Sequence, residues 1–138
     1  MSLWTQGCPH HCKGCHNPET WSFTQGQEKD IEEIKQEIIT AISANNIQRN
    51  FSVLGGEPFC EQNLKDVLDI LTFVKETYPT IKTFVWTGYI QEELTNFKNI
   101  VKDIDVLITG KYVQELRDIT LKWRGSSNQK ILYKGIDY

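Results

Sequence analysis

The sequence predicts an α/β fold, specifically a partial, open β/α barrel of parallel strands. Two observations favour this class. Short apolar runs that end in a glycine-marked turn alternate with amphipathic helical stripes, and this unit recurs about four times. The chain has 138 residues, whereas a closed eight-stranded barrel typically takes about 250. We therefore expect one domain, residues 1–138, with an open sheet at its centre.

Four apolar runs are predicted to be strands. The first is short and stands at the beginning of the chain, and the third has the continuous apolar character of a strand buried on both faces. The runs span residues 2–5, 51–54, 83–86 and 106–108.

Three segments carry the apolar spacing of amphipathic helices. The first begins near Asp30, repeats isoleucine from Ile31 to Ile42 and stops at an Asn-Asn pair. The second contains Leu64, Val67, Leu68, Leu71 and Val74, and the third contains Leu94, Phe97 and Val101.

The distinctive residues of the chain follow the predicted strands. A cysteine-containing loop comes after the first strand, and Gly and Pro residues within it exclude a regular element. Residues 55–58, 87–88 and 109–110 follow the next three strands. Ligands bind at the carboxyl ends of the strands in parallel β/α folds. We therefore expect these loops to form one site.

Charge and composition narrow the function classes. The formal net charge of −3 disfavours a nucleic-acid-binding protein, which is usually basic. No stretch approaches the roughly 20 apolar residues that a membrane span needs, and no signal peptide is evident. We expect a cytoplasmic protein without a nucleic-acid or membrane partner. Basic residues outnumber acidic ones between Lys111 and Lys134, which favours a solvated face or a partner surface.

Cys8, Cys12 and Cys15 form a cluster with the spacing C-x3-C-x2-C. A compact group in a cytosolic protein is more typical of metal binding than of disulfides. Three thiolates and no near fourth favour an iron–sulfur cluster with one iron open to another ligand. A zinc site completed by His10, His11 or His16 is the alternative, although it lacks the usual second ligand pair. Cys60 stands alone and is interpreted as a small buried hydrophobe.

The segment Gly55-Gly56-Glu57-Pro58 follows the second strand. Two glycines expose backbone groups, and such a loop suits the ammonium group of a bound amino acid. The alternative is a tight turn in which Pro58 opens the next helix.

Taken together, these motifs resemble the radical S-adenosylmethionine superfamily, and most closely the activating proteins of anaerobic ribonucleoside-triphosphate reductases. The resemblance depends on five segments that span nearly the whole chain. They are residues 7–21, 55–58, 85–89, 110–112 and 121–129.

The resemblance implies a single radical S-adenosylmethionine domain in which a [4Fe-4S] cluster and S-adenosylmethionine are the cofactors. It assigns three irons to Cys8, Cys12 and Cys15, and the fourth iron to the amino and carboxylate groups of S-adenosylmethionine. It places Gly55, Gly56 and Glu57 against the methionine part of S-adenosylmethionine, and Gly14 and His16 against its adenine. It places Thr87 and Gly88 on the same rim.

The implied activity is reductive cleavage of S-adenosylmethionine to place a glycyl radical on the reductase, with electrons from a low-potential donor. The cofactor supplies the difficult chemistry, and the protein supplies placement and exclusion of water. The segment 123–129 is typical of this family, and we expect Arg124 and Asn128 within it to help dock the reductase.

Two features depart from the family pattern. Met1 stands close to the cysteine loop, so the chain is expected to be N-terminally shortened and to lack part of its first β/α unit. Thr109 occupies a position where the family usually has an aspartate, and it receives no catalytic role. Two alternatives stay open: an activase of another glycyl-radical enzyme, such as a formate-lyase type, and a zinc-binding interaction module.

Overall fold

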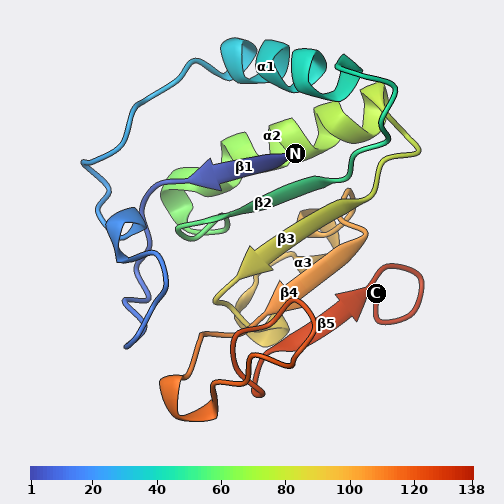
Figure 1. Ribbon diagram of the computed structural model, residues 1–138. Coiled ribbons are helices and arrows are strands. Elements are labelled where there is room, and N and C mark those ends of the chain that lie inside the picture. Colours follow the sequence, from blue (N-terminus) through green and yellow to red (C-terminus); the bar gives the residue numbers. More distant parts are fainter.

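The computed structural model describes residues 1–138 and contains one five-stranded sheet in the order β1-β2-β3-β4-β5. The strands β1 to β4 are parallel, and β5 runs antiparallel to β4. The sheet does not close (Figure 1), which confirms the predicted open α/β architecture. The strands are β1 Ser2–Thr5, β2 Phe51–Gly55, β3 Thr83–Thr87, β4 Val106–Thr109 and β5 Lys130–Tyr133.

Two long helices and one short helix connect the parallel strands: α1 Ile31–Ser43, α2 Glu61–Thr77 and α3 Phe97–Ile100. Asp30 caps α1, because its side chain accepts a hydrogen bond from the Glu32 backbone N–H at 2.9 Å. Single 3-10 turns occupy Pro18–Thr20, Gln91–Glu93 and Gln114–Leu116. No helix is both long and apolar enough to cross a membrane.

The main core lies between the helices and one face of the sheet. Val53, Val85 and Leu107 are aligned across β2, β3 and β4, and none of the three is exposed to solvent. Because side chains alternate between the two faces of a strand, this row is the inner row of the helix-covered face. The helix α2 turns four apolar side chains toward the core: Val67, Ile70, Leu71 and Val74.

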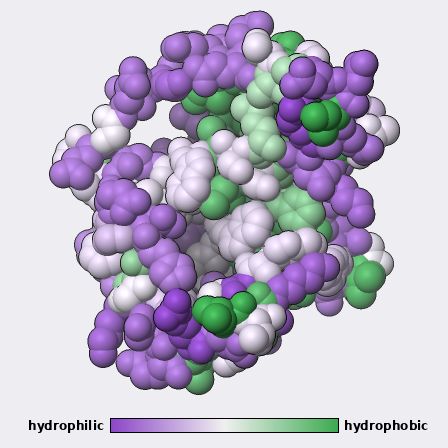
Figure 2. Space-filling model, in the orientation of Figure 1, coloured by the Kyte–Doolittle hydropathy of each residue, from purple (hydrophilic) through white to green (hydrophobic).

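The other face of the sheet has no helix over it (Figure 1). The register aligns Trp86 with Ile108 and Ile108 with Ile131 on this face, and Phe84 belongs to the same small cluster. Figure 2 shows pale and green residues over the middle of this face and purple, hydrophilic residues around it. Phe84 and Ile108 are buried, and the Trp123 ring lies 5.1 Å from the Phe84 ring, so this apolar row is covered by the later part of the chain.

Two elements differ from the sequence-based expectation. The strand β5 was not predicted, and it turns back along β4 so that the sheet is parallel in four strands instead of all five. The third predicted helix shrinks to one turn at Phe97–Ile100, because Asn96 adopts a left-handed conformation immediately before it. Neither difference changes which loops follow the parallel strands.

Candidate functional site

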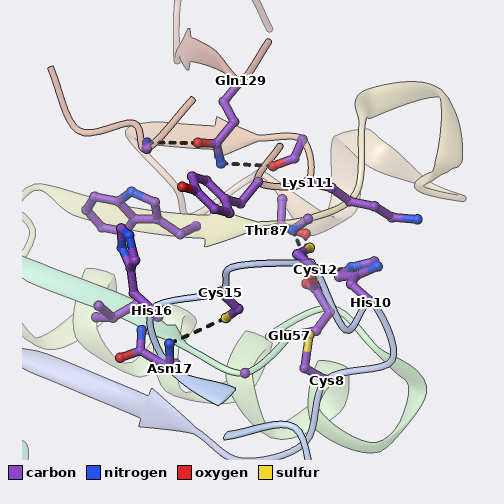
Figure 3. Close-up of a pocket in the computed structure, with 18 residues that line it drawn as sticks. Cys8, His10, Cys12, Cys15, His16, Asn17, Glu57, Thr87, Lys111 and Gln129 are labelled. Atoms are coloured by element: carbon purple, nitrogen blue, oxygen red, sulfur yellow. Dashed lines mark hydrogen bonds and ion pairs between the residues drawn. The ribbon is translucent and has the colours of Figure 1, made fainter. Parts of the chain in front are cut away.

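The cysteine loop joins β1 to α1 and folds back on itself. The backbone N–H of Gly7 donates to the carbonyl of Thr20 at 2.8 Å, and that of Cys8 donates to the carbonyl of Trp21 at 3.1 Å. These bonds close the loop at its base. Cys8, Cys12 and Cys15 lie on the closed part, are free thiols and are only half-buried. Figure 3 shows all three beside one cavity.

The sulfur of Cys15 accepts a backbone hydrogen bond, and backbone N–H groups influence the pKa of the other two thiols. The Asn17 N–H donates to the Cys15 sulfur at 3.4 Å. Burial raises the pKa of the Cys8 thiol, and the N–H groups of His10 and His11 oppose that rise. Burial likewise raises the pKa of the Cys12 thiol, opposed by the Tyr112 N–H and by the charge of Lys111. Amides that favour a thiolate also suit sulfur ligands of a metal cluster.

Glu57 is the polar centre of the site. Its side chain is 1% exposed, and its carboxylate accepts four hydrogen bonds. One oxygen accepts from the Phe59 N–H at 2.9 Å and the Thr87 hydroxyl at 2.7 Å. The other accepts from His10 Nε2 at 2.8 Å and the Gly88 N–H at 2.7 Å. A single buried carboxylate therefore joins the cysteine loop to the ends of β2 and β3.

The loops enclose a cavity of about 230 Å³ that is open on one side. Nearly all the residues that the sequence assigns to the site line it: Cys8, Cys12, Cys15, His16, Gly55, Gly56, Glu57, Thr87 and Gly88. Gly14 is the exception. Its α-carbon faces the Gln114 side chain instead, and a β-carbon there would collide with the Gln114 amide.

The glycines of the β2–α2 loop are required by close backbone approach. Gly55 has a φ of +105°, which is unfavourable for any residue with a β-carbon. A β-carbon at Gly56 would overlap the Gly7 carbonyl, and the Gly56 and Glu57 amides bond to the carbonyls of Thr5 and Gly7, both at 2.8 Å. These contacts fix the β2–α2 loop against the base of the cysteine loop.

Comparison with known proteins supplies the family. A model described as a 4Fe-4S single cluster domain matches residues 1–132. The chain is 39% identical over 132 residues to the anaerobic ribonucleoside-triphosphate reductase-activating protein of Vibrio cholerae serotype O1, across 94% of this chain and 84% of that protein. The protein of that name from Escherichia coli K12 is also 39% identical, across 94% and 85% of the two chains. Its namesake in Enterobacteria phage T4 is 35% identical, across 94% and 80%.

The chain belongs to the family of anaerobic ribonucleoside-triphosphate reductase-activating proteins. This confirms the family resemblance. The matching domain model also supports an iron–sulfur cofactor in this activating protein.

The histidines of the activating protein are engaged elsewhere, which disfavours the zinc alternative. His10 bonds to Glu57, His11 stacks on the Trp21 ring at 4.7 Å, and His16 packs against Tyr112 at 5.3 Å. No three His, Cys, Asp or Glu side chains, the three cysteines of the loop included, are gathered to hold a metal ion in this structure. Cys60 is 3% exposed and does not line the cavity, as expected for a small buried hydrophobe.

Sequence reasoning did not assign a site role to several residues that line the cavity. They are Asn17, Leu54, Trp86, Gly110, Lys111, Tyr112, Gly125 and Gln129. His10 also lines the cavity, and the sequence offered it only as an alternative zinc ligand. The sequence did contain a signal for some of these lining residues, because residues 110–112 and 121–129 are among the segments that carry the family resemblance. Thr109 is buried and does not line the cavity.

Proposed function

We propose that residues 1–138 form a radical S-adenosylmethionine domain that activates an anaerobic ribonucleoside-triphosphate reductase by placing a glycyl radical on it. The observation that carries the proposal is the shared cavity, where three free thiols face the glycine-containing ends of β2 and β3. Membership of the activating-protein family supports the reductase as the partner. An external low-potential donor would supply the electron.

The donor set fits a [4Fe-4S] cluster. Thiolates are the usual ligands of such clusters, and Cys8, Cys12 and Cys15 are not paired in disulfides. With S-adenosylmethionine bound, the cluster would supply one-electron cleavage of the sulfonium and removal of a hydrogen atom from a glycine. The Asn17 N–H that donates to the Cys15 sulfur would stabilise the negative charge of that ligand.

The other residues of the cavity would position S-adenosylmethionine and exclude water. The Glu57 carboxylate has about four acceptor positions, and protein donors occupy four. We therefore assign Glu57 to holding the cavity wall, and the half-buried loop of Gly55 and Gly56 to receiving the methionine part. Leu54 and Trp86 provide the apolar part of the lining, while His16 and Tyr112 offer rings to the adenine.

Anaerobic reconstitution tests the proposal directly. Wild-type protein should bind about four irons per chain, and Ala at position 8, 12 or 15 should abolish stable assembly. Cys60→Ala is the matched control, because that thiol is buried away from the cavity, and it should bind iron like the wild type. Zinc in place of iron and acid-labile sulfide, or loss of iron in the Cys60 variant alone, would overturn the assignment.

The partner is tested separately. Reconstituted protein should cleave S-adenosylmethionine when chemically reduced. With an anaerobic ribonucleoside-triphosphate reductase present, it should also produce a glycyl-radical doublet in electron paramagnetic resonance. Cleavage without a doublet, together with a doublet on a formate-lyase-type enzyme, would show that the chemistry is right and the partner wrong.

A further inference from the structure

A second cavity, of about 460 Å³, lies against the amino-terminal half of β3 and β4. Phe84 of β3 is aligned with Val106 of β4, and Val106 is aligned with Tyr133 of β5, so these three side chains form its floor. The Trp123 ring stands beside the floor, 5.1 Å from the Phe84 ring and nearly perpendicular to it. We call this the amino-end cavity. It shares no lining residue with the cavity beside the cysteines.

Positive charge gathers around the floor of the amino-end cavity. Lys82 stands two residues before Phe84 and so projects on the same face of the sheet. Lys122 and Lys134 also line the cavity. None of the three lysines lies within 4 Å of a carboxylate. In a chain of net charge −3, such a group of cations favours an anionic ligand.

The remaining charges nearby do not neutralise these lysines. Asp105 is the one carboxylate in the lining, and it is already paired with Lys75 at 3.0 Å. The Lys134 ammonium donates to the backbone carbonyl of Lys102, which holds the side chain in place and leaves its charge unbalanced. The amino-end cavity therefore has a net positive lining.

Trp123 is held in an unusual conformation at the edge of the cavity. Its φ is +55°, in the left-handed region that bulky residues rarely adopt. The Trp86 Nε1 donates to the Trp123 carbonyl at 2.8 Å and fixes that backbone. The Trp123 side chain is nevertheless 39% exposed, and the Lys122 ammonium lies 4.0 Å from the centre of its ring. Strained residues of this kind cluster at ligand sites, and here the strain presents an aromatic ring and a cation together.

We propose that the amino-end cavity binds a nucleoside triphosphate, with its base against the aromatic rings and its phosphates on the lysines. Every base has a face that can stack on an aromatic side chain, and lysine ammonium groups bind phosphates as point charges. The volume lies within the range of about 300–1,000 Å³ that is usual for small-molecule sites. An acidic protein segment would match the lysines and leave the exposed ring of Trp123 without a use. The site is separate from the proposed function, because it includes none of the cysteines.

Calorimetric titration with ATP tests the proposal, on the cofactor-free chain and on the reconstituted protein. ATP should bind both forms with the same affinity, because the two cavities share no residue. Inorganic triphosphate and adenosine are titrated separately, and each should bind at least about tenfold more weakly than ATP, since each offers only half of the ligand. S-adenosylhomocysteine should not displace ATP, because its adenine belongs beside the cysteine loop.

Substitutions in the lining then locate the bound ATP. Lys82→Gln with Lys122→Gln removes two charges from exposed positions, and this double variant should raise the dissociation constant of ATP at least about tenfold. Trp123→Ala should weaken binding by a similar factor, and Trp123→Phe should restore most of it. Lys65→Gln is the matched control, because Lys65 is exposed on α2 and lines none of these cavities. If Trp123→Ala does not fold, the lysine variants still decide the result.

Several results would overturn the nucleotide site, and none of them depends on iron binding. They are no binding of ATP at millimolar concentration, equal affinity for ATP and inorganic triphosphate, or displacement of ATP by S-adenosylhomocysteine. Unchanged ATP affinity in the double lysine variant would overturn it as well. A poly-glutamate peptide that binds the wild type but not the double lysine variant, where ATP does not bind, would assign the lysines to an acidic protein partner instead.

Discussion

Glu57 and Asp105 are two carboxylates at opposite ends of the same sheet, and their surroundings differ. Asp105 stands just before β4 and accepts hydrogen bonds from the Thr83 N–H at 2.8 Å and from Lys75 at 3.0 Å. Its side chain is 26% exposed. Glu57 follows β2, is 1% exposed and joins three loops. At the amino end of the sheet, a partly exposed carboxylate bonds only to neighbouring residues of the sheet and of α2. At the carboxyl end, a buried carboxylate holds three loops together, because those loops surround a cavity.

Removing the buried carboxylate should have the largest effect on stability. Glu57→Ala leaves His10, Thr87 and two backbone N–H groups without their acceptor. We expect a loss of about 3–5 kcal/mol in the free energy of unfolding, measured by urea denaturation of the cofactor-free protein. Asp105→Ala should cost about 1–2 kcal/mol, because Asp105 is partly solvated. Equal losses would contradict the contrast, and the exposed Glu92→Ala serves as the control.

The link from Glu57 to the cysteine loop should have an intermediate effect. His10→Ala removes a hydrogen bond to a buried charged group, which is typically worth about 1.5–3 kcal/mol. In a double-mutant cycle with Glu57→Ala, the double variant should lose less unfolding free energy than the sum of the two single-variant losses, since the two residues share one contact. Strict additivity would show that His10 stabilises the loop by packing on Tyr89, whose ring lies 4.6 Å away.

At the other end of the sheet, Asp105 should make stability depend on pH. Burial raises the pKa of this carboxyl, but hydrogen bonds from Thr83 and Lys75 outweigh burial and leave the pKa below its ordinary value of 3.8. A lowered folded-state pKa contributes stability above the unfolded pKa, and that contribution is lost as pH falls through the folded one. The difference in unfolding free energy between wild type and Asp105→Asn should therefore shrink between about pH 5 and pH 2. A constant difference would contradict the pKa assignment.

The smallest effect is expected on the cavity side of the cysteine loop. Cys8→Ser should change the free energy of unfolding of the cofactor-free protein by no more than about 0.5 kcal/mol, because the thiol is half-buried. The same variant should lose iron binding. A large loss of stability without cofactor would mean that the thiol is part of the folded framework and not a ligand position.

The carboxyl-end rim was predictable because each of its loops carries a local signal. Glycines follow β2 and β3, cysteines follow β1, and parallel strands bring these loops together. The sequence signal for β5 was weaker, since the segment Lys130–Tyr133 has only four residues, follows a polar run and could equally be a strand or a loop. The third helix was overestimated because its apolar spacing begins at Leu94, ahead of the left-handed Asn96 that precedes the single turn of α3.

The hydrogen bonds of the site could not be predicted from local patterns. Glu57 meets His10 and Thr87 across 47 and 30 residues of chain, and no periodicity encodes such pairs. The sequence therefore placed Glu57 against the cofactor, whereas its oxygens bind protein donors. The polar run near the end of the chain was interpreted as a docking surface for the same reason, because its partners at Gly110 and Lys111 became visible only in the structure.

The order of the segments along the chain has a consequence for biosynthesis. The cysteine loop is translated well before Asn128 and Gln129, whose side chains bond to the carbonyls of Lys111 and Gly110 at the rim of the cavity. A nascent chain can therefore present all three thiols while residues 110–113 are still unsupported. Iron delivered at that stage would meet an incomplete binding site, so productive loading follows the docking of Asn128 and Gln129 on that rim.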